Sequence, residues 1–488
     1  MRVTEAAPGD SAPQSSRTGS PVLAVFTSHW LAMVGLGLLL TAIVMWACLL
    51  PAQLRQGQEN PYVGVAMLIV GGVLVLGAVL APLGLHLGRR RVERRVASLG
   101  DRASAWRRLI AFLVVTTAFN LVIASQAALR AVHGMESRQF CGSCHVMTPE
   151  SRAFEQGPHA GILCVDCHVG DGALGFVNSK LQGTRQLLQV LTDRVHTPIE
   201  SAIASGRMIP SAETCESCHW KEKPASVRVK LIQSYAEDEA NTPETTLLTM
   251  NVGGARTGGI HGAHHGEGIE IRFVATDPAR QEIPLVEYSN AKTGTRRTYV
   301  KAGADAAALA DTPRVTMQCF DCHNRPAHAF ELAGRAVDRA LLLGRMSASL
   351  PFLKKEAVEI LEAEYTSSAA AAAEIPSALT AYYRASHPEV SSARASEIAE
   401  AGAVLADIYS RNVFPELHVT WGTYPDNRGH EDFPGCFRCH GGEHTTATGE
   451  ALTNNCFRCH HPAAVAETDP EVLEVLGVDR LIKETQSR

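Results

Sequence analysis

The sequence lacks an excess of positive charge outside its first quarter. Residues 133–488 contain 33 Lys and Arg against 45 Asp and Glu, whereas residues 1–132 contain 12 against 5. A nucleic-acid-binding protein presents a basic face, so the acidic longer part argues against nucleic acid as a partner. Long apolar runs are nearly absent from the same part. We therefore expect a membrane part followed by an acidic, water-soluble body.

The chain also has almost no cysteine outside one repeated motif. Of 13 cysteines, only Cys48 stands outside a repeated C-x-x-C-H motif, which occurs six times. Disulfide frameworks and zinc ribbons do not require a His behind every Cys pair. A c-type haem does, because two thiols bond the haem and the His binds iron. The sequence thus predicts six covalent haem c groups, at Cys141, Cys144 and His145; Cys164, Cys167 and His168; Cys215, Cys218 and His219; Cys319, Cys322 and His323; Cys436, Cys439 and His440; and Cys456, Cys459 and His460.

Three apolar stretches precede the first motif, at Val22–Leu50, Pro61–Leu87 and Leu109–Ala128. Each reaches the roughly 20 residues that a helix needs to cross a bilayer. The first stretch is longer than the apolar core of a signal peptide. The sequence therefore predicts a retained anchor of three transmembrane helices.

Arginines predict the orientation of this anchor. Eight lie between the second and third stretches, from Arg89 to Arg108, and one lies between the first and second. Positively charged loops stay in the cytoplasm, which puts the amino terminus inside and the motifs outside. We expect a multi-pass protein of the cytoplasmic (inner) membrane with its haem domain on the periplasmic side.

The segments between the motifs differ in composition. Strand-like runs at Ile269–Ala275, Ile283–Tyr288 and Thr298–Val300 indicate a small β insert, and 331–411 has helical periodicity broken by Pro351, Pro376 and Pro388. The expected fold is a mainly α membrane anchor plus a haem-packed, loop- and helix-rich multihaem cytochrome c domain. Its parts are a disordered tail (1–20), the anchor (21–132), motifs one to three (133–220), the β insert (221–318), motif four with a helical segment (319–411), and motifs five and six (412–488).

Each haem iron takes a second ligand on its opposite face, most commonly another His. Twelve His outside the motifs and spans are available, so supply exceeds demand. His261, His264 and His265 cluster before a strand, and we expect at least one ligand there, with His264 as the candidate. Met147 follows the first motif by two residues, and a thioether ligand raises the potential of a haem.

The run Cys141–Met147, C-G-S-C-H-V-M, resembles the first haem site of the NapC/NirT-type membrane-anchored quinol dehydrogenases. The resemblance implies that Met147 binds iron and that Lys180 lies in a quinol pocket. It extends to H-A-G-I-L-C-V-D-C-H and C-F-D-C-H-N-R-P-A-H. Those runs imply that His159 pairs with His323, and His328 with His219.

The chain departs from that family in size and at one position. The family typically has one membrane helix and four haems, and it carries a carboxylate where this chain has Leu187. Asp193 and Gln186 are the alternatives for that role. The segment Gly422–His444 is similar to the tails of larger inner-membrane multihaem cytochromes, which implies His430 and His444 as ligands for haems five and six.

Three functions remain open from the sequence. The first is oxidation of membrane quinol and passage of the electrons along the haems to a periplasmic or extracytoplasmic acceptor. The second is a non-catalytic haem subunit of a larger membrane respiratory complex. The third is a terminal reductase with an open iron, which the abundance of His disfavours. The expected partners are the membrane quinone pool and either a soluble or outer redox partner or other subunits.

Overall fold

The computed structural model describes residues 29–54, 61–96, 102–170, 172–192, 194–219 and 227–477. The chain divides into two compact units. The first comprises residues 1–135 and 171–181, and the second comprises residues 136–170 and 182–488. The expected disordered tail, 1–20, lies outside the described residues.

Three long helices form most of the first unit: α2 (Trp30–Leu54), α3 (Pro61–Val96) and α4 (Arg102–Glu136). Helices α2 and α3 approach closely where glycines face the neighbouring backbone. A Cβ atom at Gly84 would lie 2.2 Å from the backbone nitrogen of Ala32, and one at Gly35 would lie 2.3 Å from that of Ala81. Small residues at such contacts are typical of helix packing inside membranes.

One segment of the described residues, Leu68–Gly88 in α3, is long and apolar enough to cross a bilayer. The apolar parts described in α2 and α4 are shorter, at Trp30–Ile43 and Leu113–Val122. Large apolar side chains such as Val75 and Val79 are exposed on α3, as expected of a helix that faces lipid. The structure thus supports one span, and the three-span anchor stays a prediction.

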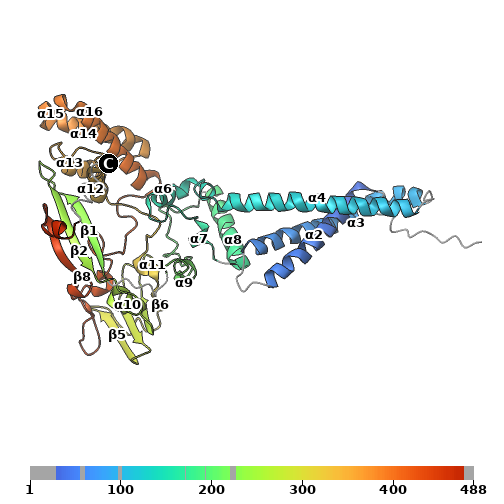
Figure 1. The fold of residues 1–488 in the computed structure, drawn as a ribbon, viewed down its shortest axis with the longest axis horizontal. Coiled ribbons are helices and arrows are strands. Elements are labelled where there is room, and N and C mark those ends of the chain that lie inside the picture. Colours follow the sequence, from blue (N-terminus) through green and yellow to red (C-terminus); the bar gives the residue numbers. More distant parts are fainter. Residues whose placement is uncertain are drawn as a thin grey trace, which may run out of the picture. The chain divides into compact units, whose positions relative to one another are not determined.

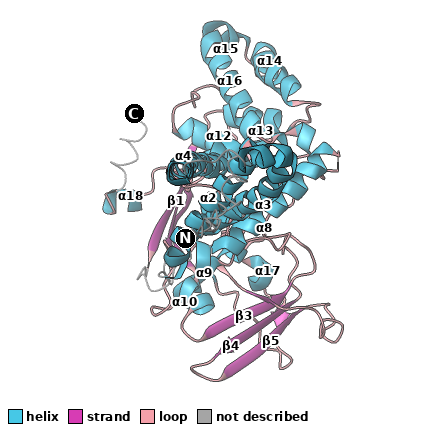
Figure 2. Ribbon diagram, turned by 90° about the vertical axis from the view of Figure 1, so that its right-hand side faces the viewer, coloured by secondary structure: helices cyan, strands magenta, loops and turns pink. Residues whose placement is uncertain are grey.

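Two antiparallel sheets lie in the second unit. The first has the order β1-β2-β8 (Figure 1), and the second has the order β6-β3-β4-β5-β7, of which β3, β4 and β5 are seen in Figure 2. The strands are β1 (Arg228–Tyr235), β2 (Pro243–Met250), β3 (Ile269–Val274), β4 (Leu285–Asn290), β5 (Thr295–Lys301), β6 (Val315–Thr316), β7 (His444–Thr445) and β8 (His460–Glu467). The strand-like runs seen in the sequence overlap β3, β4 and β5. Both sheets also include a strand from the C-terminal segment.

Five helices between the fourth and fifth motifs surround the largest buried apolar core of the described residues, which includes Leu353, Ile375 and Leu405. They are α12 (Ala333–Leu342), α13 (Leu353–Glu362), α14 (Ser368–Ser386), α15 (Pro388–Ala393) and α16 (Ala395–Asn412) (Figure 1). The expectation that Pro376 breaks a helix is wrong, because Pro376 lies inside α14. Gly402 of α16 makes room for it, since a Cβ atom there would lie 2.9 Å from the Pro376 Cα.

A buried polar cluster joins this helical core to the first sheet. Lys354 Nζ donates to Asp338 Oδ1 at 2.7 Å, and the Tyr235 backbone N–H at the end of β1 donates to the same oxygen at 3.0 Å. Asn241, in the turn before β2, donates to the backbone oxygens of Ala348 and Leu350 at 2.8 Å. Paired buried groups of this kind fix two elements against each other.

The remaining described helices are short, except for α8. They are α5 (Arg138–Cys141), α6 (Thr148–Gln156), α7 (Val165–His168), α8 (Gly172–Leu191), α9 (Ser211–Thr214), α10 (Gly259–His265), α11 (Cys319–Cys322), α17 (Phe437–His440) and α18 (Val472–Val475), with 3-10 turns η1 (His145–Met147), η2 (Pro415–Leu417) and η3 (Cys456–Arg458). All six C-x-x-C-H motifs overlap or adjoin one of these short elements.

Candidate functional site

Four of the six C-x-x-C-H motifs close into a single helical turn. In each of these four the backbone N–H of the His donates to the carbonyl oxygen of the first Cys, at 2.8–3.1 Å; they are the motifs that end at His168, His219, His323 and His440. Residues three and four apart on a helix lie on one side of it. The turn therefore presents both thiols and the imidazole to the same side, as covalent haem attachment requires.

Each motif lies close in space to the motif that follows it in the chain. The Cys141 thiol of the first motif lies beside Cys164 of the second, and Cys215 of the third lies beside Cys319 of the fourth, so that these neighbours raise the pKa of Cys164 and of Cys215. Cysteines of the other successive motifs are near enough to interact electrostatically: Cys167 with Cys218, Cys322 with Cys436, and Cys459 with Cys436. The motifs therefore form an unbroken succession from the first to the sixth.

Five motif histidines each face a second histidine. The ring centroids are 6.0 Å apart for His219 and His159, 6.1 Å for His168 and His328, 6.2 Å for His323 and His261, 5.8 Å for His440 and His264, and 6.0 Å for His460 and His430. A bond between a metal and an imidazole nitrogen is about 2 Å long, so two rings on opposite sides of one metal ion have centroids about 6 Å apart. The pairs thus fit a haem iron held from both faces.

These pairs differ from the pairing that the resemblance implied. His159 faces His219 instead of His323, and His328 faces His168 instead of His219. Each facing His comes from the sequence neighbourhood of another motif, and spacing along the chain cannot show which motif the fold brings opposite. His261, one of the three clustered histidines expected to supply a ligand, faces the fourth motif His.

Helix α10 serves two motifs at once. His261 faces His323 and His264 faces His440. The two histidines are three residues apart, so they lie on one side of the helix. The H-x-x-H spacing in the sequence was the signal for this double role. Gly259 begins the helix at φ 68°, where a Cβ atom would lie 2.7 Å from the Asn251 carbonyl oxygen.

His444 and the first motif stand apart from the five pairs. His444 is 1 % exposed, and its Nε2 lies 2.8 Å from the Ile283 carbonyl oxygen. Its Nδ1 is buried without a hydrogen-bond partner. None of the five ring pairs among the described residues includes His444, so its ligand role stays a prediction. At the first motif, His145 begins the 3-10 turn η1 and Met147 ends it.

Hydrogen bonds orient the paired rings through Nδ1. His159 Nδ1 lies 2.8 Å from the Pro326 oxygen, and His264 Nδ1 lies 2.7 Å from that of Ile260. At His328 the surroundings differ, because Nδ1 lies 2.9 Å from the Glu150 carbonyl oxygen and 3.0 Å from its Oε2. Burial opposes the charge on the Glu150 carboxylate, but His328 and Arg325 outweigh it and hold its pKa below the ordinary value.

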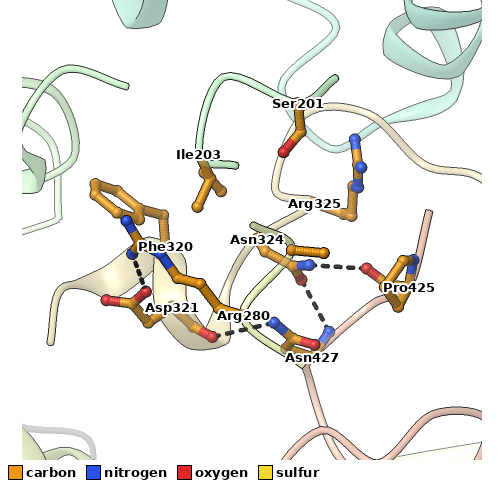
Figure 3. A pocket seen from close by; sticks show the side chains of 10 residues that line it. Ser201, Ile203, Arg280, Phe320, Asp321, Asn324, Arg325, Pro425 and Asn427 are labelled. Carbon is orange, nitrogen blue, oxygen red and sulfur yellow. Dashed lines mark hydrogen bonds and ion pairs between the residues drawn. The ribbon is translucent and has the colours of Figure 1, made fainter. Parts of the chain in front are cut away.

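A cavity of about 30 Å³ adjoins the fourth motif (Figure 3). Arg280 forms an ion pair with Asp321 on one side of it. Asn324 joins the two ends of the lining, since its Nδ2 donates to the Pro425 oxygen and its Oδ1 accepts from the Asn427 backbone N–H, both at 2.8 Å. The Nε of Arg325, which also lines the cavity, is buried without a hydrogen-bond partner. Such a buried donor fits a site for an anionic group.

Helix α8 carries Lys180. Its Nζ lies 4.9 Å from the centroid of the Phe176 ring, and Phe176 packs against Val132 near the end of α4. The lysine is half-buried at this position. Leu187 is also on α8, whereas Asp193 lies outside the described residues. At the other end of α8, a cavity of about 510 Å³ is lined by Arg185, Leu188, Gln189, Thr192, Arg194 and His196.

Comparisons with known proteins agree with this chemistry. Residues 103–242 match the model of the NapC/NirT cytochrome c family, N-terminal region. The cytochrome c-type protein ImcH of Geobacter sulfurreducens is 38 % identical over 446 residues, covering 88 % of this chain and 85 % of the relative. No solved structure matches the chain.

Proposed function

Because this chain belongs to the NapC/NirT cytochrome c family, we propose that it is a membrane-anchored hexahaem cytochrome that oxidises quinol and passes the electrons outward. The observation that carries the proposal is the succession of six motifs in which five motif histidines face a second histidine. Haem c, when bound there, supplies one-electron oxidation and reduction.

The residues that would hold the haems follow from these contacts. Each pair of cysteines would form the thioether links, and the motif histidine with its facing histidine would hold the iron at motifs two to six. A pair of facing histidines would leave no place for a substrate at these motifs, which favours electron transfer over a terminal reductase. At the first motif, we propose Met147 as an iron ligand, on the family resemblance.

Entry of electrons is proposed at α8. The contact of Phe176 with Val132 puts the Lys180 turn beside the end of α4, and α4 is the helix that leads into the first motif. A neutral lysine amine there can accept a proton that the quinol hydroxyl releases on oxidation, and the resulting ammonium group can donate a hydrogen bond to the quinone oxygen. The cavity lined by Arg185 and His196 is the second place on α8 for a quinol headgroup.

Exit of electrons is proposed at the sixth motif. Cys456 and Cys459 are both exposed, whereas each of the other motifs has at least one partly buried cysteine. Phe457 between them is 62 % exposed. A redox partner can therefore approach this motif more closely than the others.

Anaerobic mixing with a quinol tests the proposal. The full-length holoprotein in liposomes is mixed with 2,3-dimethyl-1,4-naphthoquinol, and the haem absorption band is followed. We expect rapid reduction, and about 100-fold slower reduction for Lys180→Met, because a positioned proton-transfer group contributes on that scale. Lys355→Met, at an exposed lysine of α13, is the matched control. His196→Gln tests the second location.

The outcomes separate the open functions. Full reduction by dithionite with none by quinol would make the chain a haem subunit of a larger complex. A Lys180→Met variant that reacts at the rate of the unmodified protein, combined with a slow His196→Gln variant, would move the quinol to the cavity at the end of α8.

A further inference from the structure

The carboxylate of Glu150 lies directly behind one of the paired histidines. Glu150 is in the first turn of α6, three residues beyond Met147, and it is 7 % exposed. Its Oε2 lies 3.0 Å from His328 Nδ1, on the ring whose other side faces His168. The carboxylate therefore contacts the His328 and His168 pair although its own chain position is next to the first motif.

Other paired rings have a backbone carbonyl oxygen alone at this place. His159 and His264 have backbone carbonyl oxygens within 2.8 Å of Nδ1, and His440 has the Thr453 oxygen at 2.7 Å. A carbonyl orients the ring and polarises it weakly. At His328 the Glu150 carbonyl oxygen takes the same place, 2.9 Å from Nδ1, but a carboxylate oxygen lies beside it. The full negative charge next to Nδ1 makes the imidazole a stronger electron donor to a metal.

Arg325 provides a counter-charge on the far side of the carboxylate. Its Nη1 lies 3.7 Å from Glu150 Oε1, and its guanidinium carbon lies 4.3 Å from the centroid of the Tyr424 ring. Both side chains of this ion pair are 9 % exposed. Water screens such charges weakly, so both charges act on His328, and the carboxylate lies directly beside the ring at 3.0 Å.

We propose that Glu150 is a positioning residue that orients His328 and lowers the midpoint potential of the haem held by His168 and His328. The inference rests on the proposed function in that these two histidines hold a haem. A negative charge beyond the ligand stabilises the ferric iron, which carries one positive charge more than the ferrous iron. The second haem then accepts an electron less readily than it would with a carbonyl alone behind its ligand.

This assignment predicts a fall in midpoint potential between the first and the second haem. The second motif directly follows the first, where Met147 is the proposed ligand and a thioether raises the potential. Electrons entering at the first haem would meet a lower potential at the second. Met147 and Glu150 are three residues apart in sequence. Met147 would raise the potential of the first haem, whereas Glu150 would lower that of the second.

A redox titration of the full-length holoprotein tests this assignment without any quinol. Glu150→Gln keeps the backbone carbonyl that hydrogen-bonds His328 Nδ1 and the size of the side chain but removes the charge. We expect one of six midpoint potentials to move upward and the largest g value of one low-spin ferric signal to rise in electron paramagnetic resonance. Glu155→Gln, at an exposed carboxylate of the same helix, is the matched control and should change neither.

Two further variants keep the test decisive. Arg325→Gln removes the opposing charge and should move the same potential downward, while Glu150→Asp should retain most of the original value. Unchanged potentials and g values in Glu150→Gln would overturn the inference. So would a high-spin signal in Glu150→Gln, because it would show that the residue only holds His328 in place. A haem count below six in the unmodified protein would instead count against the proposed function.

Discussion

His430 and His444 come from the same C-terminal segment, yet their surroundings differ. The His430 ring stacks on Phe437, with centroids 4.1 Å apart, and faces His460. The His444 ring is buried and contacts the Ile283 carbonyl oxygen. The first arrangement leaves a ring nitrogen directed at a motif histidine, and the second uses the ring to join β7 to the chain before β4.

Substitution separates these two roles. His430→Ala should convert one low-spin ferric haem to high spin, because the ring that faces His460 is lost. His444→Ala should leave all low-spin signals in place and lower the free energy of unfolding by about 2 kcal/mol, the cost of a lost buried contact and hydrogen bond. Electron paramagnetic resonance and thermal unfolding measure the two effects. A high-spin signal in His444→Ala would instead confirm the ligand role predicted from the sequence.

Residue identity alone predicted one side of each haem site. The His directly behind each Cys pair is fixed by local spacing, whereas the opposite ligand depends on which segments the fold brings together. His159 was identified as a candidate, but its partner was not, because His219 lies in a different motif turn. Glu150 could not be selected, since an acid in the first turn of a helix is common for local reasons.

At the scale of elements, the Lys354 and Asp338 pair carries the attachment of β1 to the helices. Lys354 donates to Asp338 Oδ1 and, at 2.6 Å, to the Gly334 oxygen. The two side chains are 6 % and 9 % exposed. Burial raises the pKa of Asp338 although the ammonium opposes this, so the ionised carboxylate depends on Lys354 for compensation.

Lys354→Met should therefore lower the free energy of unfolding by about 3–5 kcal/mol, because it leaves a buried carboxylate uncompensated. The double variant Asp338→Asn with Lys354→Met should be less destabilised. Lys355→Met, one position along α13 and exposed, should stay within about 0.5 kcal/mol of the unmodified protein. Urea unfolding followed by circular dichroism measures all three. Equal losses for Lys354→Met and Lys355→Met would contradict the compensating role.

The sequence predicted some helices and strands and missed others, and each outcome has a physical reason. Alternation of apolar and polar residues indicated β3 to β5, and helical periodicity indicated α12 to α16. Pro376 was misjudged because core packing keeps α14 helical despite the hydrogen bond that a proline loses. Ile375 and Leu379 on either side of it are buried in the core, and the facing Gly402 lets α16 approach the Pro376 backbone. The β1 and β2 strands were missed, since their pairing with β8 is not visible in local sequence.

At the scale of the whole molecule, the number of spans decides which side of the membrane each connection faces. With the haem body outside, three spans put residue 56 outside and residue 98 inside. A single span at Leu68–Gly88 would reverse both positions. The arginines between the second and third apolar stretches favour three spans.

Fusions of alkaline phosphatase after Gln56 and after Ser98 distinguish these arrangements, because the enzyme is active only outside the cytoplasmic membrane. We expect activity at Gln56 and none at Ser98. A fluorescent protein that matures only inside, fused at the same two positions, should give the complementary pattern. Phosphatase activity at Ser98 without activity at Gln56 would establish a single span.

The closing strand of the first sheet has a consequence for the order of biogenesis. Thr249 of β2 pairs with His461 of β8, 212 residues later in the chain, and β8 begins at the motif histidine His460. During export, β1 and β2 therefore emerge long before their third strand, with one edge open to unwanted pairing. The sheet can close only when the last haem-attachment sequence has been delivered. We therefore expect completion of this sheet to be a late step of folding, which follows delivery of the sixth motif.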